Sequence, residues 1–182
     1  MAHTAYPQSY YAASANPVPE RPELNGEVET DVCIVGAGYT GLSTAIALLE
    51  SGFKVSIVEA AKVGFGASGR NGGQIVNSYS RDIDVIERSV GPKQAKLLGD
   101  MAFEGGRIIR ERIAKYNIQC DLKDGGVFAA NTPKHMKHLE SQKKLWERYG
   151  HTQLELMDAK RIREVVDSDA YVGGMLDMSG GH

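Results

Sequence analysis

A glycine-rich motif followed by an acidic residue suits the binding of a dinucleotide. The motif matches G-x-G-x-x-G and consists of Gly36, Ala37, Gly38, Tyr39, Thr40 and Gly41. Glu59 follows about 20 residues later, the usual spacing in dinucleotide-binding βαβ units. Gly36 permits a tight turn, Gly38 lets a pyrophosphate touch the backbone, and Gly41 lets a helix pack close to the strands. The Glu59 carboxylate can accept hydrogen bonds from both ribose hydroxyls and would repel a 2′-phosphate, which disfavours NADP.

Hydrophobic periodicity predicts the elements that must position this motif. Residues 32–35 form a continuous apolar run, typical of a strand buried on both faces of a parallel sheet. From Gly41 to Leu49 the apolar residues fall at helical spacing, and residues 53–59 predict a second strand. The resulting βαβ unit offers the free N–H groups of a helix N-terminus, and about half a positive charge, to phosphates. The alternative is a glycine-rich turn in another α/β protein, which this complete context disfavours.

A second glycine-rich stretch, residues 64–74, follows where a simple NAD domain usually has a crossover helix. Ser68, Arg70, Asn71 and Gln74 interrupt its glycines. Arg70 can bond phosphate oxygens in a fork, Ser68 can add a hydroxyl, and backbone without side chains can approach a planar ring. Because the fingerprint alone fits NAD and FAD equally, this stretch is what favours FAD. Composition alone leaves a flexible linker open as the alternative.

The rest of the chain predicts further helices and strands. Helices are expected at residues 83–90 and 92–116, from Pro133 to about residue 149 after a Thr132 cap, and from an Asp158 cap to residue 166. Residues 118–130 predict two short strands around a turn at 124–126, and the last residues predict a strand that leads into a glycine-rich turn. Gly105 and Gly106 fall in mid-helix, where we expect them to serve close helix packing.

Composition limits the classes of function. The 182 residues are 42% hydrophobic with a formal net charge of −2, which allows one domain or slightly more and gives no general attraction to nucleic acid or anionic membranes. No apolar run approaches the roughly 20 residues of a membrane span. His135 and His138 share a predicted helix without a third ligand, so we predict no metal site. Two isolated cysteines make no disulfide framework, which favours the cytoplasm. Residues 1–30 are expected to form an extended arm, not a signal peptide.

The segments "DVCIVGAGYTGLSTAIALLESGFKVSIVEA" and "GFGASGRNGGQ" together resemble the N-terminal part of the FAD-dependent amine and D-amino-acid oxidoreductases. That family includes glycine oxidase, sarcosine oxidase and D-amino acid dehydrogenase. The resemblance implies an α/β fold with a Rossmann-like FAD-binding βαβ domain of the glutathione-reductase/D-amino-acid-oxidase type, incomplete, and the start of a substrate domain. We expect the arm at residues 1–30, the N-terminal part of the FAD-binding domain at 31–120, and a truncated start of the substrate or cap region at 121–182.

The resemblance also implies which residues bind FAD. Gly36, Gly38 and Gly41 would hold the pyrophosphate, with Tyr39 and Thr40 in the same turn. Glu59 would bind the adenosine ribose, with Ala60 beside it. The path from the pyrophosphate to the isoalloxazine ring would be lined by Ser68, Arg70, Asn71, Gly72, Gly73 and Gln74. No catalytic residue in this chain is implied.

The implied reaction is oxidation of the terminal amine of γ-glutamylputrescine, or of a similar primary amine, in putrescine catabolism. FAD would accept the equivalent of a hydride from the carbon that bears the amine, the imine would hydrolyse to an aldehyde and ammonia, and oxygen would yield hydrogen peroxide. Because the family's chains are considerably longer, we expect a fragment that needs the remaining C-terminal part for turnover. An NAD-dependent dehydrogenase and a dinucleotide-binding subunit of a hetero-oligomeric flavin oxidase are the alternative functions.

Overall fold

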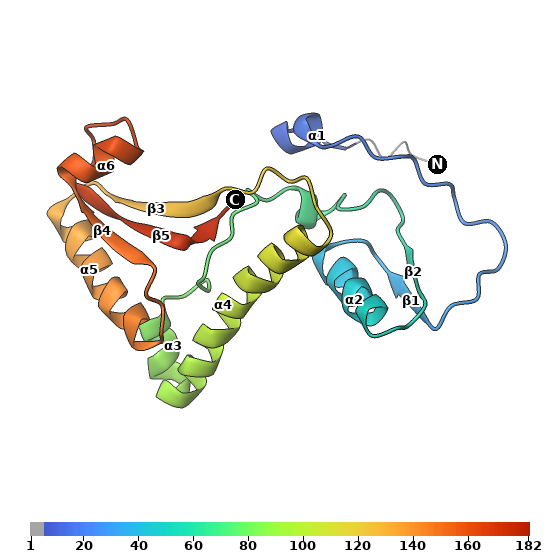
Figure 1. Cartoon of the computed structure of the whole chain (residues 1–182), viewed down its shortest axis with the longest axis horizontal. Coiled ribbons are helices and arrows are strands. Elements are labelled where there is room, and N and C mark those ends of the chain that lie inside the picture. The colour runs from blue at the N-terminus through green and yellow to red at the C-terminus, as the bar shows by residue number, and fades with distance from the viewer. Residues whose placement is uncertain (1–5) are drawn as a thin grey trace. The chain divides into compact units, whose positions relative to one another are not determined.

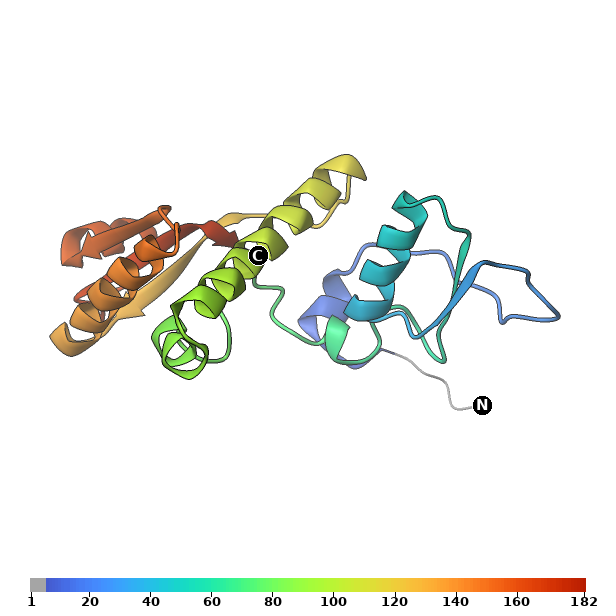
Figure 2. The same ribbon diagram turned by 90° about the horizontal axis from the view of Figure 1, so that it is seen from below.

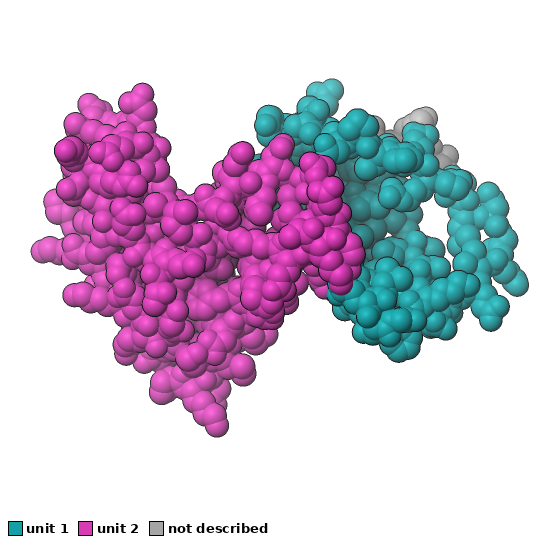
Figure 3. Space-filling model, viewed as in Figure 1, with its two compact units in different colours: residues 1–72 teal, residues 73–182 magenta. Residues whose placement is uncertain are grey.

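The computed structural model describes residues 6–182. The chain divides into two compact units, Met1–Gly72 and Gly73–His182, which are coloured separately in Figure 3. The domain limits expected at residues 30 and 120 stay predictions. Among the described residues, no helix combines the length and the apolar character that a membrane crossing needs.

The first unit contains the predicted βαβ arrangement. Strand β1 (Val32–Val35) leads into helix α2 (Tyr39–Glu50), which returns the chain to strand β2 (Val55–Val58). The two strands pair in parallel, with Val32 opposite Val55 and Val35 opposite Val58, and α2 lies against them (Figures 1 and 2). The strand–helix–strand prediction is therefore confirmed, as is the position of the glycine motif at the start of the helix.

The prediction that β1 is buried on both faces is wrong for this structure. Val32 and Ile34 are half-buried, whereas Cys33 is exposed and the exposed fraction of Val35 is 87%. The physical reason is that β1 and β2 form a two-stranded sheet with α2 against it, so side chains that alternate along β1 meet different surroundings.

The expected N-terminal arm also contains a short helix, α1 (Tyr10–Ser14). The hydroxyl of Ser9 caps it by accepting a hydrogen bond from the Ala12 N–H across 3.2 Å. The first five residues of the expected arm lie outside the described part of the chain.

The second unit is built from four helices and a three-stranded antiparallel sheet. The helices are α3 (Ile83–Val90), α4 (Pro92–Lys115), α5 (Pro133–Arg148) and α6 (Ala159–Val165). The strands are β3 (Asp124–Ala130), β4 (Leu154–Asp158) and β5 (Gly173–Gly181), in the order β3-β5-β4. Helices α5 and α6 pack against the sheet, and α3 packs against both α4 and α5 (Figure 1).

The helix limits follow the local signals in the sequence. Pro92 and Pro133 each stand at the start of a helix, where their missing N–H costs nothing. The Thr132 hydroxyl accepts from the His135 N–H, and the Asp158 carboxylate accepts from the N–H groups of Lys160 and Arg161. The core that these helices share with the sheet contains Ile83, Ala95, Leu145, Trp146, Tyr149, Leu154 and Met175.

The two predictions that placed glycine-rich turns in this sheet are wrong. Residues 124–126 belong to the single strand β3, where Gly125 has a φ of +97° and the register shifts as in a β-bulge. Strand β5 continues to Gly181 without a turn. Its glycines serve close packing, since a Cβ at Gly174 would lie 2.8 Å from Ile162 Cδ1 and 2.9 Å from the Phe128 carbonyl oxygen. Strand β4 was not predicted.

Candidate functional site

The glycine motif forms the tight connection between β1 and α2. Gly36 has a φ of +100°, a conformation that favours glycine, and its N–H donates to the Val58 carbonyl oxygen across 2.8 Å. A Cβ on Gly41 would lie only 2.0 Å from the Gly36 carbonyl oxygen and 3.3 Å from Ile34 Cγ2. Glycine at position 41 is therefore required for α2 to approach β1 this closely.

The first turn of α2 presents N–H groups toward the glycine-rich loop. Gly38 is the N-cap of α2 in an extended conformation without a side-chain cap. The Tyr39 N–H donates to the Ser68 hydroxyl across 3.0 Å, and a Cβ on Gly38 would lie 3.0 Å from the same oxygen. The N–H groups of Thr40 and Gly41 find no acceptor among residues 6–182. This helix end therefore keeps donors that an anionic group can use.

Glu59 follows β2 and reaches back to the glycine motif. Its Oε2 accepts from the Ala37 N–H across 2.8 Å and its Oε1 from the Ala61 N–H across 3.0 Å. These donors, Ala37 first and then Ala61, hold the pKa of Glu59 below its ordinary value. Glu59 and the adjacent Ala60 are exposed. A carboxylate has about four lone-pair sites, so Glu59 retains capacity for hydroxyl donors.

The glycine-rich loop has a defined conformation. The Gly64 N–H donates to the Ala37 carbonyl oxygen across 2.9 Å, which joins the loop to the first motif. A short 3₁₀ helix, η1 (Ala67–Gly69), follows. Gly64 has a φ of +69°, and a Cβ on Gly69 would lie 2.2 Å from the Gly64 carbonyl oxygen. Gly64 and Gly69 are thus required by the loop's own folding, whereas a Cβ on Gly66 would meet open space.

Arg70 and Asn71 are both held by contacts within the first unit. The Arg70 Nε–H donates to the Phe65 carbonyl oxygen across 3.0 Å, and the guanidinium carbon lies 5.2 Å from the centre of the Phe65 ring. The Asn71 amide donates to the Tyr39 hydroxyl across 2.9 Å and to the Ser68 carbonyl oxygen across 3.0 Å. An open hollow beside these residues is lined by Phe65, Gly66, Ala67, Arg70 and Asn71.

The end of the loop is divided between the two units. Gly72 is the last residue of the first unit, and Gly73 and Gln74 begin the second. Gly73 has a φ of +69°, and both residues are exposed. Within its own unit, this segment leads directly into Ile75, which pairs with Gly181 at the end of β5.

Comparison with known proteins identifies the family. The family model described as FAD dependent oxidoreductase, or DAO, matches residues 31–182. The chain belongs to this family. FAD is accordingly the cofactor of its family, and the α/β fold expected for a FAD-binding domain of this type is confirmed.

Two curated relatives of this FAD-dependent oxidoreductase match almost all of it. The chain is 59% identical over 179 residues to "Gamma-glutamylputrescine oxidoreductase" of Escherichia coli strain K12, which covers 98% of this chain and 42% of that protein. It is 41% identical over 183 residues to "Probable oxidoreductase OrdL" of Haemophilus influenzae, covering 100% of this chain and 42% of that protein. The chain thus spans about two fifths of the length of these relatives.

Solved structures of lower identity share the fold. The L-amino acid deaminase of Proteus myxofaciens has a TM-score of 0.69 at 22% identity, and the matched part covers 92% of this chain and 36% of the deaminase chain. Glycine oxidase of Bacillus cereus has a TM-score of 0.58 at 21% identity, and the matched part covers 85% of this chain and 40% of the glycine oxidase chain. These similarities concern the fold.

The residues of the first unit fit an FAD nucleotide. A diphosphate needs close backbone approach and N–H donors, and the structure provides side-chain-free Gly36 and Gly38 and the acceptor-free N–H groups of Thr40 and Gly41. A ribose needs an acceptor for its hydroxyls, and Glu59 provides an exposed carboxylate hydrogen-bonded to the same turn. The donor set therefore agrees with the chemistry of the group.

Sequence reasoning missed two aromatic residues that fix the loop. Phe65 lies under the Arg70 guanidinium, and the Tyr6 hydroxyl donates to the Val63 carbonyl oxygen across 2.7 Å. The Tyr6 and Phe65 rings are tilted at 37° with their centres 6.3 Å apart. The signal that could have revealed Phe65 is the presence of one bulky aromatic residue in an otherwise small-residue stretch.

Proposed function

We propose that the first unit binds the ADP half of FAD through the residues that the sequence predicted. Gly36, Gly38 and the α2 N-terminus contact the pyrophosphate, and Glu59 accepts hydrogen bonds from the adenosine ribose. The observation that supports this most strongly is the hydrogen bond from Ala37 to Glu59, because it holds the ribose acceptor beside the phosphate turn. The other residues that we propose to contact FAD are Tyr39, Thr40, Gly41, Ala60, Ser68, Arg70, Asn71 and Gly72 of the first unit, and Gly73 and Gln74 at the start of the second unit.

Arg70 has a specific role in this proposal. Its side chain is exposed, and among the described residues its guanidinium donates through Nε alone, to the Phe65 carbonyl oxygen. Its terminal nitrogens can therefore contribute a forked pair of donors to a phosphate. The Phe65 ring lies under the guanidinium carbon and restrains the side chain, which reduces the entropy that Arg70 would lose on binding.

For the whole protein we propose oxidation of the terminal amine of γ-glutamylputrescine, or of a similar primary amine. The basis is the 59% identity to the E. coli relative that bears this name. When bound, FAD supplies the two-electron oxidation of the carbon that carries the amine. Amine, oxygen and water would then yield an aldehyde, ammonia and hydrogen peroxide. The residues of this chain bind and orient the cofactor. For the cellular location we propose the reducing cytoplasm, which suits the exposed and unpaired Cys33 and Cys120.

The test is amine-dependent peroxide release by the full-length gene product that contains this chain. With FAD present, γ-glutamylputrescine is expected to give equal amounts of peroxide and ammonia, and free putrescine to react more slowly. NAD in place of oxygen as the electron acceptor is the control for a nicotinamide-dependent dehydrogenase. Flavin-loaded protein that produced no peroxide or ammonia with either amine would contradict the proposed reaction.

A further inference from the structure

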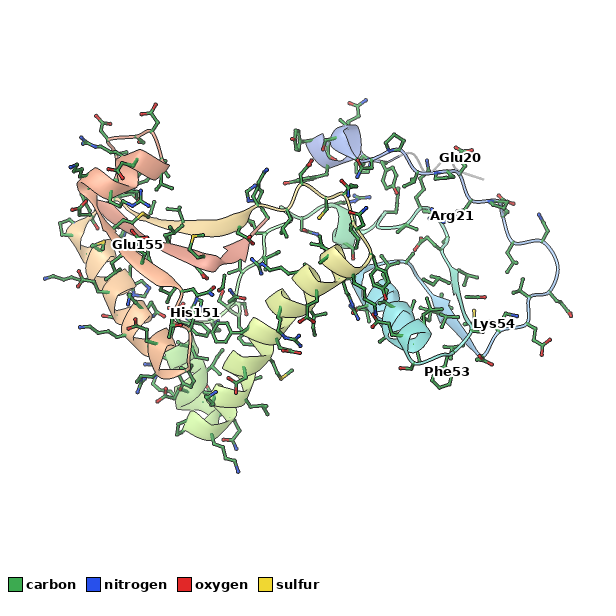
Figure 4. The ribbon with its side chains drawn as sticks, in the orientation of Figure 1. Glu20, Arg21, Phe53, Lys54, His151 and Glu155 are labelled. Carbon is green, nitrogen blue, oxygen red and sulfur yellow. The ribbon has the colours of Figure 1, made fainter. Side chains whose placement is uncertain are left out.

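A cluster of polar side chains is buried at the end of β5 in the second unit. Asp177, His151 and Asn77 each have an exposed fraction of 6%, and Ser179 is half-buried beside them. His151 lies where the chain enters β4 (Figure 4), and its ring centre is 4.7 Å from that of Phe103 of α4. None of these residues belongs to the proposed nucleotide site, so their polar chemistry needs another explanation.

Asp177 is the centre of this cluster. Its Oδ1 accepts from the Ser179 N–H across 2.9 Å, from the Ser179 hydroxyl across 2.8 Å and from the Gly180 N–H across 3.3 Å. His151 Nε2 lies 3.2 Å from the same oxygen and makes no hydrogen bond among the described residues, so the two groups form a close polar contact. One carboxylate therefore fixes the backbone of the last residues of β5.

The cluster extends from β5 to the segment that follows the glycine-rich loop. The Asn77 amide donates to the Ser179 hydroxyl across 2.6 Å. Two residues earlier, Ile75 exchanges backbone hydrogen bonds with Gly181, of 2.6 Å and 3.1 Å. Ile75 directly follows Gln74, so these bonds hold the chain next to Gly73 and Gln74, the first residues of the second unit.

Helix α4 contacts the same region through Arg110 and Gly106. The Arg110 guanidinium donates to the Gly180 carbonyl oxygen across 2.8 Å and to Asp124 Oδ1 across 3.0 Å. Gly106 leaves room for the segment, because a Cβ there would lie 3.0 Å from Asn77 Oδ1. The end of β5 and the segment of residues 75–77 are therefore fixed together by charged and polar groups.

We propose that Asp177 is a positioning residue, which holds residues 75–77 against β5 and so fixes, within the second unit, the position of Gly73 and Gln74, two residues of the proposed FAD site. This inference rests on the proposed function. A buried carboxylate is a costly way to fill a core and is destabilising when unpaired. What it provides here is a fixed geometry for two backbone segments far apart in sequence, and a misplacement of about 1 Å in such a support can reduce a rate about 100-fold.

The test compares four variants of the full-length, FAD-loaded protein. Asp177→Asn removes the charge and keeps the shape, and Ser179→Ala removes the link to Asn77. Ser179→Thr keeps the hydroxyl, and Asp167→Asn removes an exposed acid of the same unit. The measurements are the visible circular dichroism of bound flavin, its rate of reduction by amine without oxygen, and the melting temperature.

Asp177→Asn and Ser179→Ala are expected to alter the flavin dichroism and to slow reduction at saturating amine by about tenfold or more. Ser179→Thr is expected to restore both properties, and Asp167→Asn to leave them unchanged. The inference would be overturned if Asp177→Asn and Ser179→Ala lowered the melting temperature but kept the flavin dichroism and reduction rate of Asp167→Asn. The role of Asp177 would then be purely structural. Wild-type protein without flavin would overturn the proposed function itself, so the two failures are distinguishable.

Discussion

The Ala37 N–H donates to Glu59 Oε2 across 2.8 Å, which connects the glycine turn after β1 with the acid after β2. The bond links the turn that we propose to bind phosphate with the acid that we propose to bind ribose. A contact that holds two binding groups together lowers the entropy cost of binding.

Glu59→Gln is expected to weaken FAD binding several-fold, because hydrogen bonds to a charged carboxylate are stronger than those to a neutral amide. Titration of the apoprotein with FAD, followed by flavin fluorescence, measures this. Glu27→Gln, an exposed position in the arm, is the matched control. The pKa of Glu59 is lowered from its ordinary 4.5, chiefly by the Ala37 N–H. The contribution of the Glu59 carboxylate to the stability of the fold is thus complete above pH 4.5 and declines as the pH falls through the lowered pKa. Equal affinities of both variants would contradict the ribose assignment.

Gly41→Ala is expected to reduce the free energy of unfolding by about 2–4 kcal/mol and to impair FAD binding. The reason is the 2.0 Å approach of its Cβ to the Gly36 carbonyl oxygen, which only a movement of α2 can relieve. Chemical denaturation measures the stability. Gly66→Ala is the control, since its Cβ meets open space, and should change the free energy by less than about 0.5 kcal/mol. A Gly41→Ala protein as stable as Gly66→Ala would show that this close approach does not exist.

Gly105→Ala and Gly106→Ala are expected to have opposite effects on the melting temperature. A Cβ at Gly105 meets open space, so alanine should stabilise α4 by about 0.5–1 kcal/mol through its higher helix propensity. A Cβ at Gly106 would lie 3.0 Å from Asn77 Oδ1 and 3.6 Å from Ile75 Cγ2, and this crowding should outweigh the same gain. Thermal unfolding of the two variants measures the difference. If both substitutions stabilise the protein equally, residues 75–77 do not pack on α4 as described.

Asp177 should make the protein sensitive to acid. Burial alone would raise its pKa, but His151 and Ser179 outweigh that effect, so the pKa lies below its ordinary 3.8. The stabilisation from Asp177 is therefore complete above pH 3.8 and is lost as the pH falls through the lower, folded-state pKa. Melting temperatures between about pH 5 and about pH 2 should fall less steeply for Asp177→Asn than for the wild-type protein. Parallel curves would indicate that Asp177 is not paired.

Local signals in the sequence were sufficient to predict the βαβ unit and most helices. The start of α2 follows from its glycines, and the starts of α4 and α5 follow from Pro92 and from Thr132 with Pro133. Each signal acts through neighbouring backbone, so no knowledge of distant residues is needed.

The features that sequence reasoning missed depend on distant partners. The glycines of β5 resemble a turn in the sequence, but Gly174 is small because Ile162 and the Phe128 carbonyl oxygen pack against it. In the sequence Asp177 resembles any other polar residue, because the fold brings Asn77 and His151 to it from distant positions in the chain. The same holds for the contact of Tyr39 with Asn71, which joins the two glycine-rich segments.

The most direct test of the central claim is the visible absorption spectrum of the purified full-length gene product that contains this chain. The account predicts a yellow protein with the bands of oxidised flavin, which bleach when γ-glutamylputrescine is added without oxygen and return when oxygen is admitted. Extraction should release FAD in proportion to the protein. A colourless protein that binds no FAD but binds NADH would contradict it.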